Sequence, residues 1–312
     1  MSLLEAFDLR KSYNGTPAVD GLSFAVEPGE VLGLLGPNGS GKTTTMMMLA
    51  GLLRPDSGRV VLLGKEMRSN DRELRAQLGV VPQDLAVYLE LTPRENLNFF
   101  GRLYGLHGET LQKKVDEILE QTGLTKNADG LVGTFSGGMM RRLNFGIALL
   151  HSPRLIILDE PTVGVDPQSR SHLLDAVRQQ AATGVGVLYA SHYMEEVEAI
   201  CDRVAIIDHG KLLVYDRVDQ LLGKLTPDLC LHVVATPQLA AKLNGLAKLT
   251  TDDGNASIHL PANANGQGPL NDRLQRVLAV MKDSGSELKS IETQEANLER
   301  LFLELTGRHL RD

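Results

Sequence analysis

The sequence lacks tryptophan altogether, and only 4% of its 312 residues are aromatic. Its two cysteines, Cys201 and Cys230, are far apart, which predicts neither a disulfide framework nor a zinc site and favours a reducing compartment. No apolar run approaches the roughly 20 residues that span a bilayer, and the first residues do not resemble a signal peptide. The net charge of −7, without a long basic block, argues against general nucleic-acid binding, so no nucleic-acid partner is expected.

The most informative feature that is present is a glycine-rich run ending in a lysine and two threonines. It matches the phosphate-loop pattern G-x-x-x-x-G-K-[S/T], in which glycines let backbone amides point at nucleotide phosphates. Lys42 supplies a charge for the β- and γ-phosphates, and the Thr43 hydroxyl is placed to ligate Mg²⁺. A strand-like run precedes the loop and a helical run follows it. These flanking segments argue against an ordinary Gly/Ser turn. The candidate nucleotide-binding residues are Gly36, Pro37, Asn38, Gly39, Ser40, Gly41, Lys42, Thr43 and Thr44.

The first part of the chain, to about residue 222, alternates apolar runs with helical patterns, as expected of an α/β fold. The apolar runs are too continuous for strands with one solvated face, so most belong in a sheet that is covered on both faces. Thr92-Pro93-Arg94-Glu95 reads as a helix capping box, and a later apolar stripe from Leu111 to Leu119 ends at Gly123. The predicted strands are Val31–Leu35, Val60–Leu63, Leu155–Leu158, Val185–Ala190 and Val204–Ile207.

The pattern changes around Leu222–Pro227, which predicts a second domain over residues 226–312. The expected order there is β-α-β-β-α-β with one further helix, a small α+β arrangement that resembles a ferredoxin-like domain. Residues 252–255 give a hairpin signal, and Asn263–Gly268 reads as a loop. The predicted strands are 229–235, 249–251, 257–260 and 287–292, and the predicted helices are 238–246, 270–281 and 298–305.

Two further motifs carry chemistry in the first part. Leu155–Leu158 is followed by Asp159 and Glu160, where a phosphate-loop protein places a carboxylate that holds Mg²⁺ and a second that polarises the attacking water. A solvated acidic turn is the plain alternative for this pair taken alone. Between the two motifs, Ser136 precedes Gly137 and Gly138, which predicts a helix N-cap that lets amides approach an anion. Alone, that segment would be read as an ordinary capped helix.

The order of these motifs resembles the ATP-binding subunits of ABC transporters over residues 3–222. The resemblance implies a P-loop NTPase (ABC ATPase) core over residues 1–222, with a helical subdomain at about 84–150, and ATP and Mg²⁺ as cofactors. Four more positions match in order: an aromatic that stacks on adenine, the Q-loop glutamine, the D-loop aspartate and the switch histidine. These are Tyr13, Gln83, Asp166 and His192.

The resemblance also assigns roles across a dimer of ATPase subunits, which would be a homodimer or a heterodimer. Glu160 would be the base, His192 would hold the γ-phosphate, and Gln83 would sense metal and water. The residues that would hold the metal are Thr43, Gln83 and Asp159. Asp166 would cross the dimer interface, and the trans signature that closes over the partner's nucleotide would consist of Ser136, Gly137, Gly138 and Met139.

The signature departs from the commonest form, because Phe135 replaces leucine and Met139 replaces glutamine. Met140-Arg141-Arg142 follows, and this variant resembles the ABC-2 type exporter branch, which includes drug-resistance, sodium-export and polysaccharide-export ATPases. The branch implies integral-membrane permease subunits as partners and a place at the cytoplasmic face of the membrane. Nucleotide contact should survive the change at Met139, since the Ser136 hydroxyl and the glycine amides remain.

A soluble ABC ATPase that acts on ribosomes or nucleic acid is the alternative function. The chain has one phosphate loop and no long insert between Lys42 and Ser136, which favours the transporter subunit. Tyr88, or Phe99 and Phe100, would lie where the family contacts its permease, although for the two phenylalanines the core of the helical subdomain is the preferred interpretation. The sequence does not identify the substrate.

Overall fold

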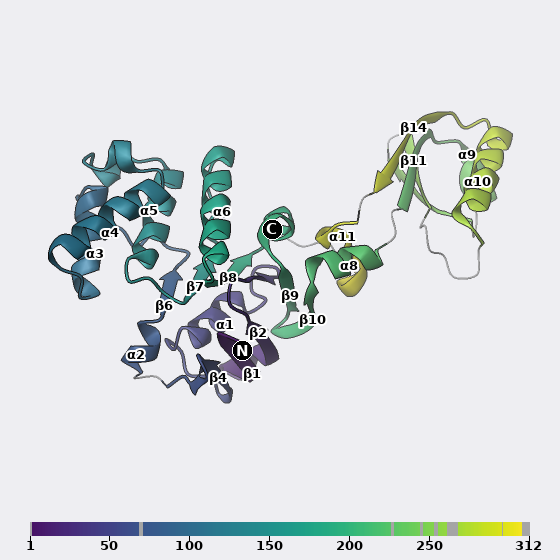
Figure 1. Cartoon of the computed structure of the whole chain (residues 1–312). Helices are drawn as coiled ribbons and strands as arrows, with labels where there is room; N and C mark the ends of the chain where they lie inside the picture. Colours follow the sequence, from purple (N-terminus) through teal and green to yellow (C-terminus); the bar gives the residue numbers. More distant parts are fainter. Residues whose placement is uncertain are drawn as a thin grey trace. The chain divides into compact units, whose positions relative to one another are not determined.

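The computed structural model describes residues 2–68, 71–225, 228–243, 246–252, 255–260, 268–294 and 296–307. The chain divides into two compact units (Figure 1). The first comprises Met1–Val218 together with Phe302–Asp312, and the second comprises Asp219–Leu301. Each unit has its own apolar core.

The first unit is built around a six-stranded sheet with the order β10-β9-β3-β8-β7-β6. The strands from β9 to β6 run parallel, and β10 pairs antiparallel with β9 at one edge. Every residue of β3, β7 and β8 is buried, which explains why their sequences are continuously apolar. Four of the predicted strands are confirmed in this sheet. The bounds are β3 Val31–Leu35, β6 Leu78–Val81, β7 Leu155–Asp159, β8 Gly186–Ser191, β9 Arg203–Asp208 and β10 Lys211–Arg217.

The strand predicted at residues 60–63 lies instead in an antiparallel sheet with the order β2-β1-β4-β5. The sequence did not predict the β1–β2 hairpin that forms most of this sheet. Its residues Leu4, Leu9 and Leu22 share one apolar core with Leu32 and Leu34 of β3, so the two sheets pack together. The bounds are β1 Leu4–Tyr13, β2 Thr16–Val26, β4 Ser57–Leu62 and β5 Lys65–Glu66.

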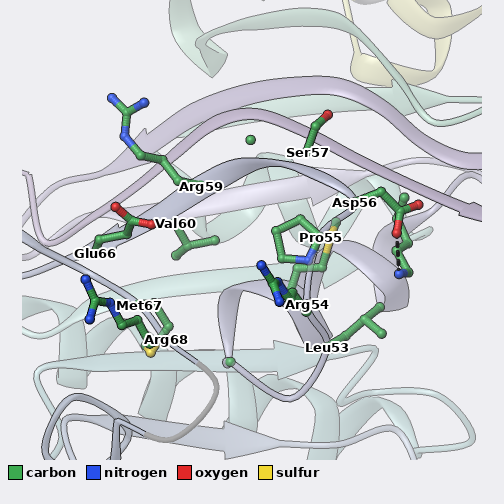
Figure 2. A pocket seen from close by; sticks show the side chains of 14 residues that line it. Leu53, Arg54, Pro55, Asp56, Ser57, Arg59, Val60, Glu66, Met67 and Arg68 are labelled. Carbon is green, nitrogen blue, oxygen red and sulfur yellow. Dashed lines mark hydrogen bonds and ion pairs between the residues drawn. The ribbon is translucent and has the colours of Figure 1, made fainter.

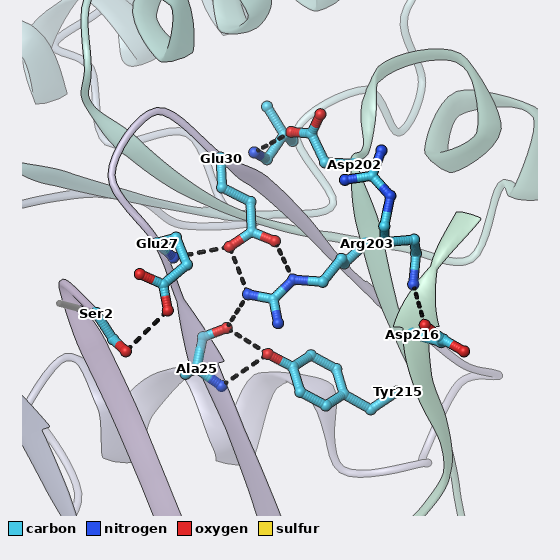
Figure 3. A network of polar contacts seen from close by, with 10 residues as sticks. Ser2, Ala25, Glu27, Glu30, Asp202, Arg203, Tyr215 and Asp216 are labelled. Atoms are coloured by element: carbon cyan, nitrogen blue, oxygen red, sulfur yellow. Dashed lines mark hydrogen bonds and ion pairs between the residues drawn. The ribbon is translucent and has the colours of Figure 1, made fainter. Parts of the chain in front are cut away.

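A network of hydrogen bonds joins β2 to β9 and β10 at one edge of the main sheet (Figure 3). The Arg203 guanidinium donates from two nitrogens to the Glu30 carboxylate, and this pairing raises the pKa of Arg203. Arg203 and the Tyr215 hydroxyl also donate to the carbonyl of Ala25, at 3.1 and 2.7 Å. The Arg203 guanidinium lies 4.9 Å from the centre of the Tyr215 ring. One buried carboxylate therefore helps to join the β2 backbone to β9 and β10.

Three helices, α3, α4 and α5, gather together between β6 and β7 in the chain (Figure 1). The predicted capping box is confirmed: the Thr92 side chain accepts from the Glu95 backbone, and the Glu95 side chain accepts from the Thr92 backbone. The helices of the first unit include α1 Lys42–Leu49, α2 Arg72–Arg75, α3 Pro93–Leu103, α4 Gly108–Gln121, α5 Gly137–Leu149, α6 Pro167–Ala182 and α7 Met194–Ile200.

The second unit contains a four-stranded antiparallel sheet with the order β12-β13-β11-β14. Together with α9 and α10, it shows the predicted β-α-β-β-α-β order, and side chains of β11, β13, α9 and α10 form a shared apolar core. The tip of the predicted hairpin at 253–254 and most of the predicted loop, at 263–267, lie outside the described residues. The bounds are β11 Asp228–Val234, α9 Pro237–Lys242, β12 Lys248–Asp252, β13 Asn255–Leu260, α10 Leu270–Ser284 and β14 Leu288–Gln294. Two more helices, α8 Val218–Lys224 and α11 Leu298–Thr306, include residues of both units.

Candidate nucleotide site

The glycine loop lies between β3 and α1, and close backbone contacts on both sides fix its path. A Cβ at Gly36 would lie 2.3 Å from the carbonyl oxygen of Ile207, and one at Gly41 would lie 2.3 Å from that of Ala18. Gly41 also has a φ of 104°, which L side chains rarely adopt. Helix α1 begins directly after it, with no side-chain cap and no acid in its first turn. The N-terminal amides of α1 are thus left for an anionic ligand.

Lys42, Glu160 and His192 form a chain of polar contacts beyond the carboxyl ends of three neighbouring strands, with Lys42 and Glu160 buried and His192 partly buried. Lys42 Nζ donates to the carbonyl of Gly36 at 2.7 Å and lies 3.1 Å from Glu160 Oε1. The other oxygen of Glu160 lies 3.2 Å from His192 Nδ1. The residues follow β3, β7 and β8, and β8 separates the other two strands, so the sheet order itself brings the three side chains together.

Glu160 has a backbone conformation that is rare for a residue with a side chain. Its φ is 45°, and its N–H donates to the carbonyl of Ala190 at 3.0 Å. A non-glycine residue held in this region costs on the order of 1–3 kcal/mol and persists where its surroundings impose it. This backbone conformation directs the Glu160 carboxylate toward Lys42 and His192. Glu160 is only 6% exposed.

Asp159 and Thr43 form the part of the site that fits a divalent cation. Asp159 Oδ1 is buried and has no hydrogen-bond partner within the described part of the chain. Burial raises the pKa of Asp159, which its hydrogen bond with the Thr43 side chain counteracts. A cation beside this carboxylate would favour its charged form. No group of three or more His, Cys, Asp or Glu among the described residues is arranged to hold a metal ion. Mg²⁺ prefers few carboxylates together with phosphate oxygens and water.

Two predicted residues are not brought into this cluster. Tyr13 ends β1 and is 48% exposed. Gln83 is exposed after β6, and its carbonyl accepts a hydrogen bond from Arg141 of α5. Strands β7 and β8 separate β6, which precedes Gln83, from β3, which precedes the phosphate loop. The arrangement leaves both side chains open to approach from solvent.

The Ser136 segment begins α5, apart from the Lys42 cluster. The Ser136 hydroxyl accepts from the backbone of Met139 at 3.3 Å, so the predicted N-cap is confirmed. Gly137 is exposed, but a Cβ at Gly138 would lie 2.3 Å from the side chain of Ser169 in α6. The sequence assigned both glycines to an anion, whereas Gly138 is also needed for the packing of α5 against α6.

Asp166 caps α6 within its own chain. Its side chain accepts from the backbone N–H of Ser169 at 2.9 Å, and this bond lowers the pKa of Asp166. Pro167 occupies the first turn of the helix. The residue is exposed, so a cap in its own chain leaves it open to a second subunit as well.

The sequence did not single out Glu196, a buried carboxylate in α7. It accepts hydrogen bonds from Thr162, Tyr189 and Ser191. An acid two residues into a helix usually faces solvent, and only its position four residues after His192 would have drawn attention to it.

A cavity of about 810 Å³ lies away from the phosphate loop, beside β4 and β5 (Figure 2). The side chains around it include Arg54, Arg59 and Arg68. None of the candidate nucleotide residues lines it. No pattern in the sequence predicted this cavity.

Comparison with known proteins identifies the family. Residues 19–163 match the ABC transporter family. The linearmycin resistance ATP-binding protein of Bacillus subtilis is 42% identical over 312 residues, which cover 99% of this chain and 100% of that protein. The Nod factor export ATP-binding protein I of Ralstonia nicotianae is 37% identical, with coverages of 99% and 95%. The daunorubicin resistance ATP-binding protein of Streptomyces coeruleorubidus is 36% identical, with coverages of 96% and 93%.

Solved structures agree with these relatives and confirm the expected fold. An ATP-binding subunit of an ABC transporter has a TM-score of 0.65 and 30% identity, covering 72% of this chain and 93% of its own. An ATP-binding cassette in its ADP conformation has a TM-score of 0.64 and 28% identity, covering 70% and 92%. The relatives' names favour transport and lend no support to action on ribosomes. The chain therefore belongs to the ABC transporter family and is an ATP-hydrolysing subunit of its drug-resistance and export branch.

Proposed function

We propose that Lys42, Thr43, Asp159, Glu160 and His192 form the hydrolytic half-site of this subunit. The observation that carries the proposal is the buried contact of Lys42 with Glu160, since it couples phosphate binding to the base. A γ-phosphate in the loop competes for Lys42 and releases Glu160 to take a proton from water. His192, already beside Glu160, then faces the same phosphate. Mg²⁺ held by Asp159 and Thr43 would neutralise charge on the phosphates.

The proposed half-site is completed by the Ser136–Met139 signature of a second ATPase subunit. In the described residues, no hydrogen bond or ion pair joins Ser136 to Lys42 or Glu160 of its own chain. The exposed Ser136 and Gly137 are therefore available to a partner, and Tyr13 and Gln83 would engage nucleotide, metal and water there. Residues 1–222, including the helical subdomain at 84–150, would carry this activity, with 226–312 as an accessory domain.

Mixing two inactive variants tests the composite site. Gly137→Glu places a charge where the structure has space, since its Cβ would meet nothing closer than the Gly164 carbonyl at 3.5 Å. Lys42→Met disables the phosphate loop of its own chain. Each variant alone is expected to be inactive, whereas an equal mixture should recover about a quarter of wild-type ATP turnover through mixed dimers. A mixture no more active than its components would contradict a composite site made by two copies of this chain.

The proposed contact with a membrane permease lies on the helical subdomain. No helix among the residues described is long and apolar enough to cross a bilayer. Tyr88, Phe99 and Phe100 form an aromatic cluster, with ring centres 5.1 Å apart for Tyr88 and Phe99. The expectation that Phe99 is core was wrong: it is 45% exposed, because α3 buries the side that carries Asn96 and Leu97. The cluster would hold the subunit at the cytoplasmic face through an ABC-2 type permease.

Loss of this cluster should separate membrane binding from hydrolysis. In Tyr88→Ser/Phe99→Ser, recovery of a polytopic membrane protein with the tagged chain from gently solubilised membranes should fall about tenfold. ATP turnover of the isolated chain should stay within about twofold of wild type, because neither ring contacts the buried cluster. Leu52→Ser is the matched control, as Leu52 is 61% exposed in another part of the unit. Equal recovery with both variants would exclude the aromatic cluster as the contact.

A further inference from the structure

Glu196 is a buried acid that accepts hydrogen bonds from three residues in two segments, the turn after β7 and strand β8. Its side chain is 3% exposed. Oε2 accepts from the hydroxyls of Thr162 and Tyr189, both at 2.8 Å, and from Ser191 at 3.1 Å. Burial raises the pKa of Tyr189 well above its ordinary value, so its hydroxyl stays protonated as a donor. Three donors on one oxygen fix the position of this carboxylate.

The other oxygen of Glu196 faces Arg170, which is linked to His192 through the ring of Tyr193. Glu196 Oε1 lies 3.3 Å from Nε of Arg170 in α6. The Arg170 guanidinium lies 5.0 Å from the centre of the Tyr193 ring, which is 4.1 Å from the centre of the His192 ring. A continuous series of contacts thus runs from Glu196 to His192.

The same carboxylate is also linked to the segments that follow Glu160 and precede His192. Thr162 comes two residues after Glu160, and Ser191 comes directly before His192. The Ser191 hydroxyl also accepts from the backbone of Tyr193 at 2.9 Å, which shapes the turn that presents His192. Glu196 therefore contacts the supports of both residues that we place at the γ-phosphate.

Stability alone is a weak reason for a charge at this position. A buried ion pair is often no more stabilising than apolar residues of similar volume, and here most of the partners lie beside the hydrolytic residues. We propose that Glu196 is a positioning residue that holds His192 and the segment after Glu160 in the arrangement that recognises the γ-phosphate. The inference rests on the proposed roles of Glu160 and His192. It predicts a defect specific to the triphosphate, because ADP lacks that group.

Glu196→Gln tests this role with little change of volume. The amide keeps one acceptor oxygen, but it offers Arg170 no charge and adds an NH₂ group among donors. We expect kcat for ATP to fall about tenfold or more, as for other residues that orient active-site groups. The affinity for ADP should stay within about twofold of wild type, while the ratio of ATP to ADP affinity falls about fivefold. If Glu196 served only folding, its loss would lower the affinities for ATP and ADP equally.

Two further variants keep the test decisive. Glu30→Gln is the matched control, since Glu30 is also a buried carboxylate paired with an arginine but lies before β3, at the end opposite the phosphate loop. It should lower the melting temperature and leave kcat per folded molecule unchanged. If Glu196→Gln does not fold, Arg170→Met replaces it, because Arg170 is 33% exposed, and Arg170→Lys should restore part of the lost kcat.

The outcomes separate this inference from the proposed site. If Glu196→Gln keeps wild-type ATP turnover while Glu160→Gln is inactive, the proposed hydrolytic role of Glu160 is supported and the role of Glu196 is not. A lower kcat with a reduced ATP-to-ADP ratio would support the positioning role. A kcat within twofold of wild type, or equal losses of ATP and ADP affinity with a lowered melting temperature, would overturn it.

Discussion

Glu160→Gln is expected to reduce ATP turnover by about 100- to 1,000-fold while leaving ATP binding intact. The amide has the shape of the carboxylate but cannot take a proton from water, and a positioned general base contributes about 10² to 10⁴ in rate. Binding should persist because Lys42 keeps its bonds to the carbonyls of Gly36 and Pro37 and loses a competitor for the phosphates. Phosphate release at saturating ATP, alongside equilibrium nucleotide binding, measures the two effects separately.

The same variant should accumulate an ATP-dependent dimer. If γ-phosphate joins two subunits, blocking its removal preserves the contact, and size-exclusion chromatography with ATP and Mg²⁺ should show a dimer that ADP does not support. Glu195→Gln is the matched control: it makes the identical change at an exposed acid in α7. Full steady-state turnover in Glu160→Gln would refute the role assigned to Glu160.

Local sequence patterns predicted those parts of the site that depend on chain order. The phosphate loop requires a strand before it and a helix after it, and all three elements are continuous from Val31 to Leu49. Asp159 and Glu160 end a buried strand whose apolar run is visible in the sequence. The distance of 3.1 Å between Lys42 and Glu160 was not predictable in the same way, because it depends on β8 lying between their strands.

The features that the sequence did not predict arise from contacts between distant segments. Gly138 is small because Ser169 packs against it, and a packing partner 31 positions away leaves no local signal. The β1–β2 hairpin mixes buried and exposed residues irregularly, with several shifts of register, so its alternation is weak. Glu196 resembles any acid in a first helical turn until Thr162, Tyr189 and Ser191 converge on it.

Lys42→Met should abolish detectable turnover and, without nucleotide, also destabilise the first unit. Loss of a positioned cation at the transferring phosphate costs on the order of 10²–10³ in kcat. The stability effect follows from burial: Lys42 and Glu160 are 5% and 7% exposed, and removing one partner leaves the other charge buried beside His192 alone. We expect a loss of about 2–3 kcal/mol in the free energy of unfolding, which is less than the 3–5 kcal/mol typical of fully buried pairs because His192 remains.

A double variant distinguishes this electrostatic explanation from a loss of packing. Lys42→Met/Glu160→Gln has no uncompensated charge, so the nucleotide-free double variant should melt above Lys42→Met, which itself should melt about 4–12 °C below wild type. Melting temperatures of the wild type, both single variants and the double variant, measured without ATP, give the coupling between the two positions. If the two single losses simply add, Lys42 does not stabilise Glu160 in the nucleotide-free chain. A positive coupling would mean that the phosphate loop and the base are already joined before ATP arrives, so that ATP binding must exchange one partner of Lys42 for another.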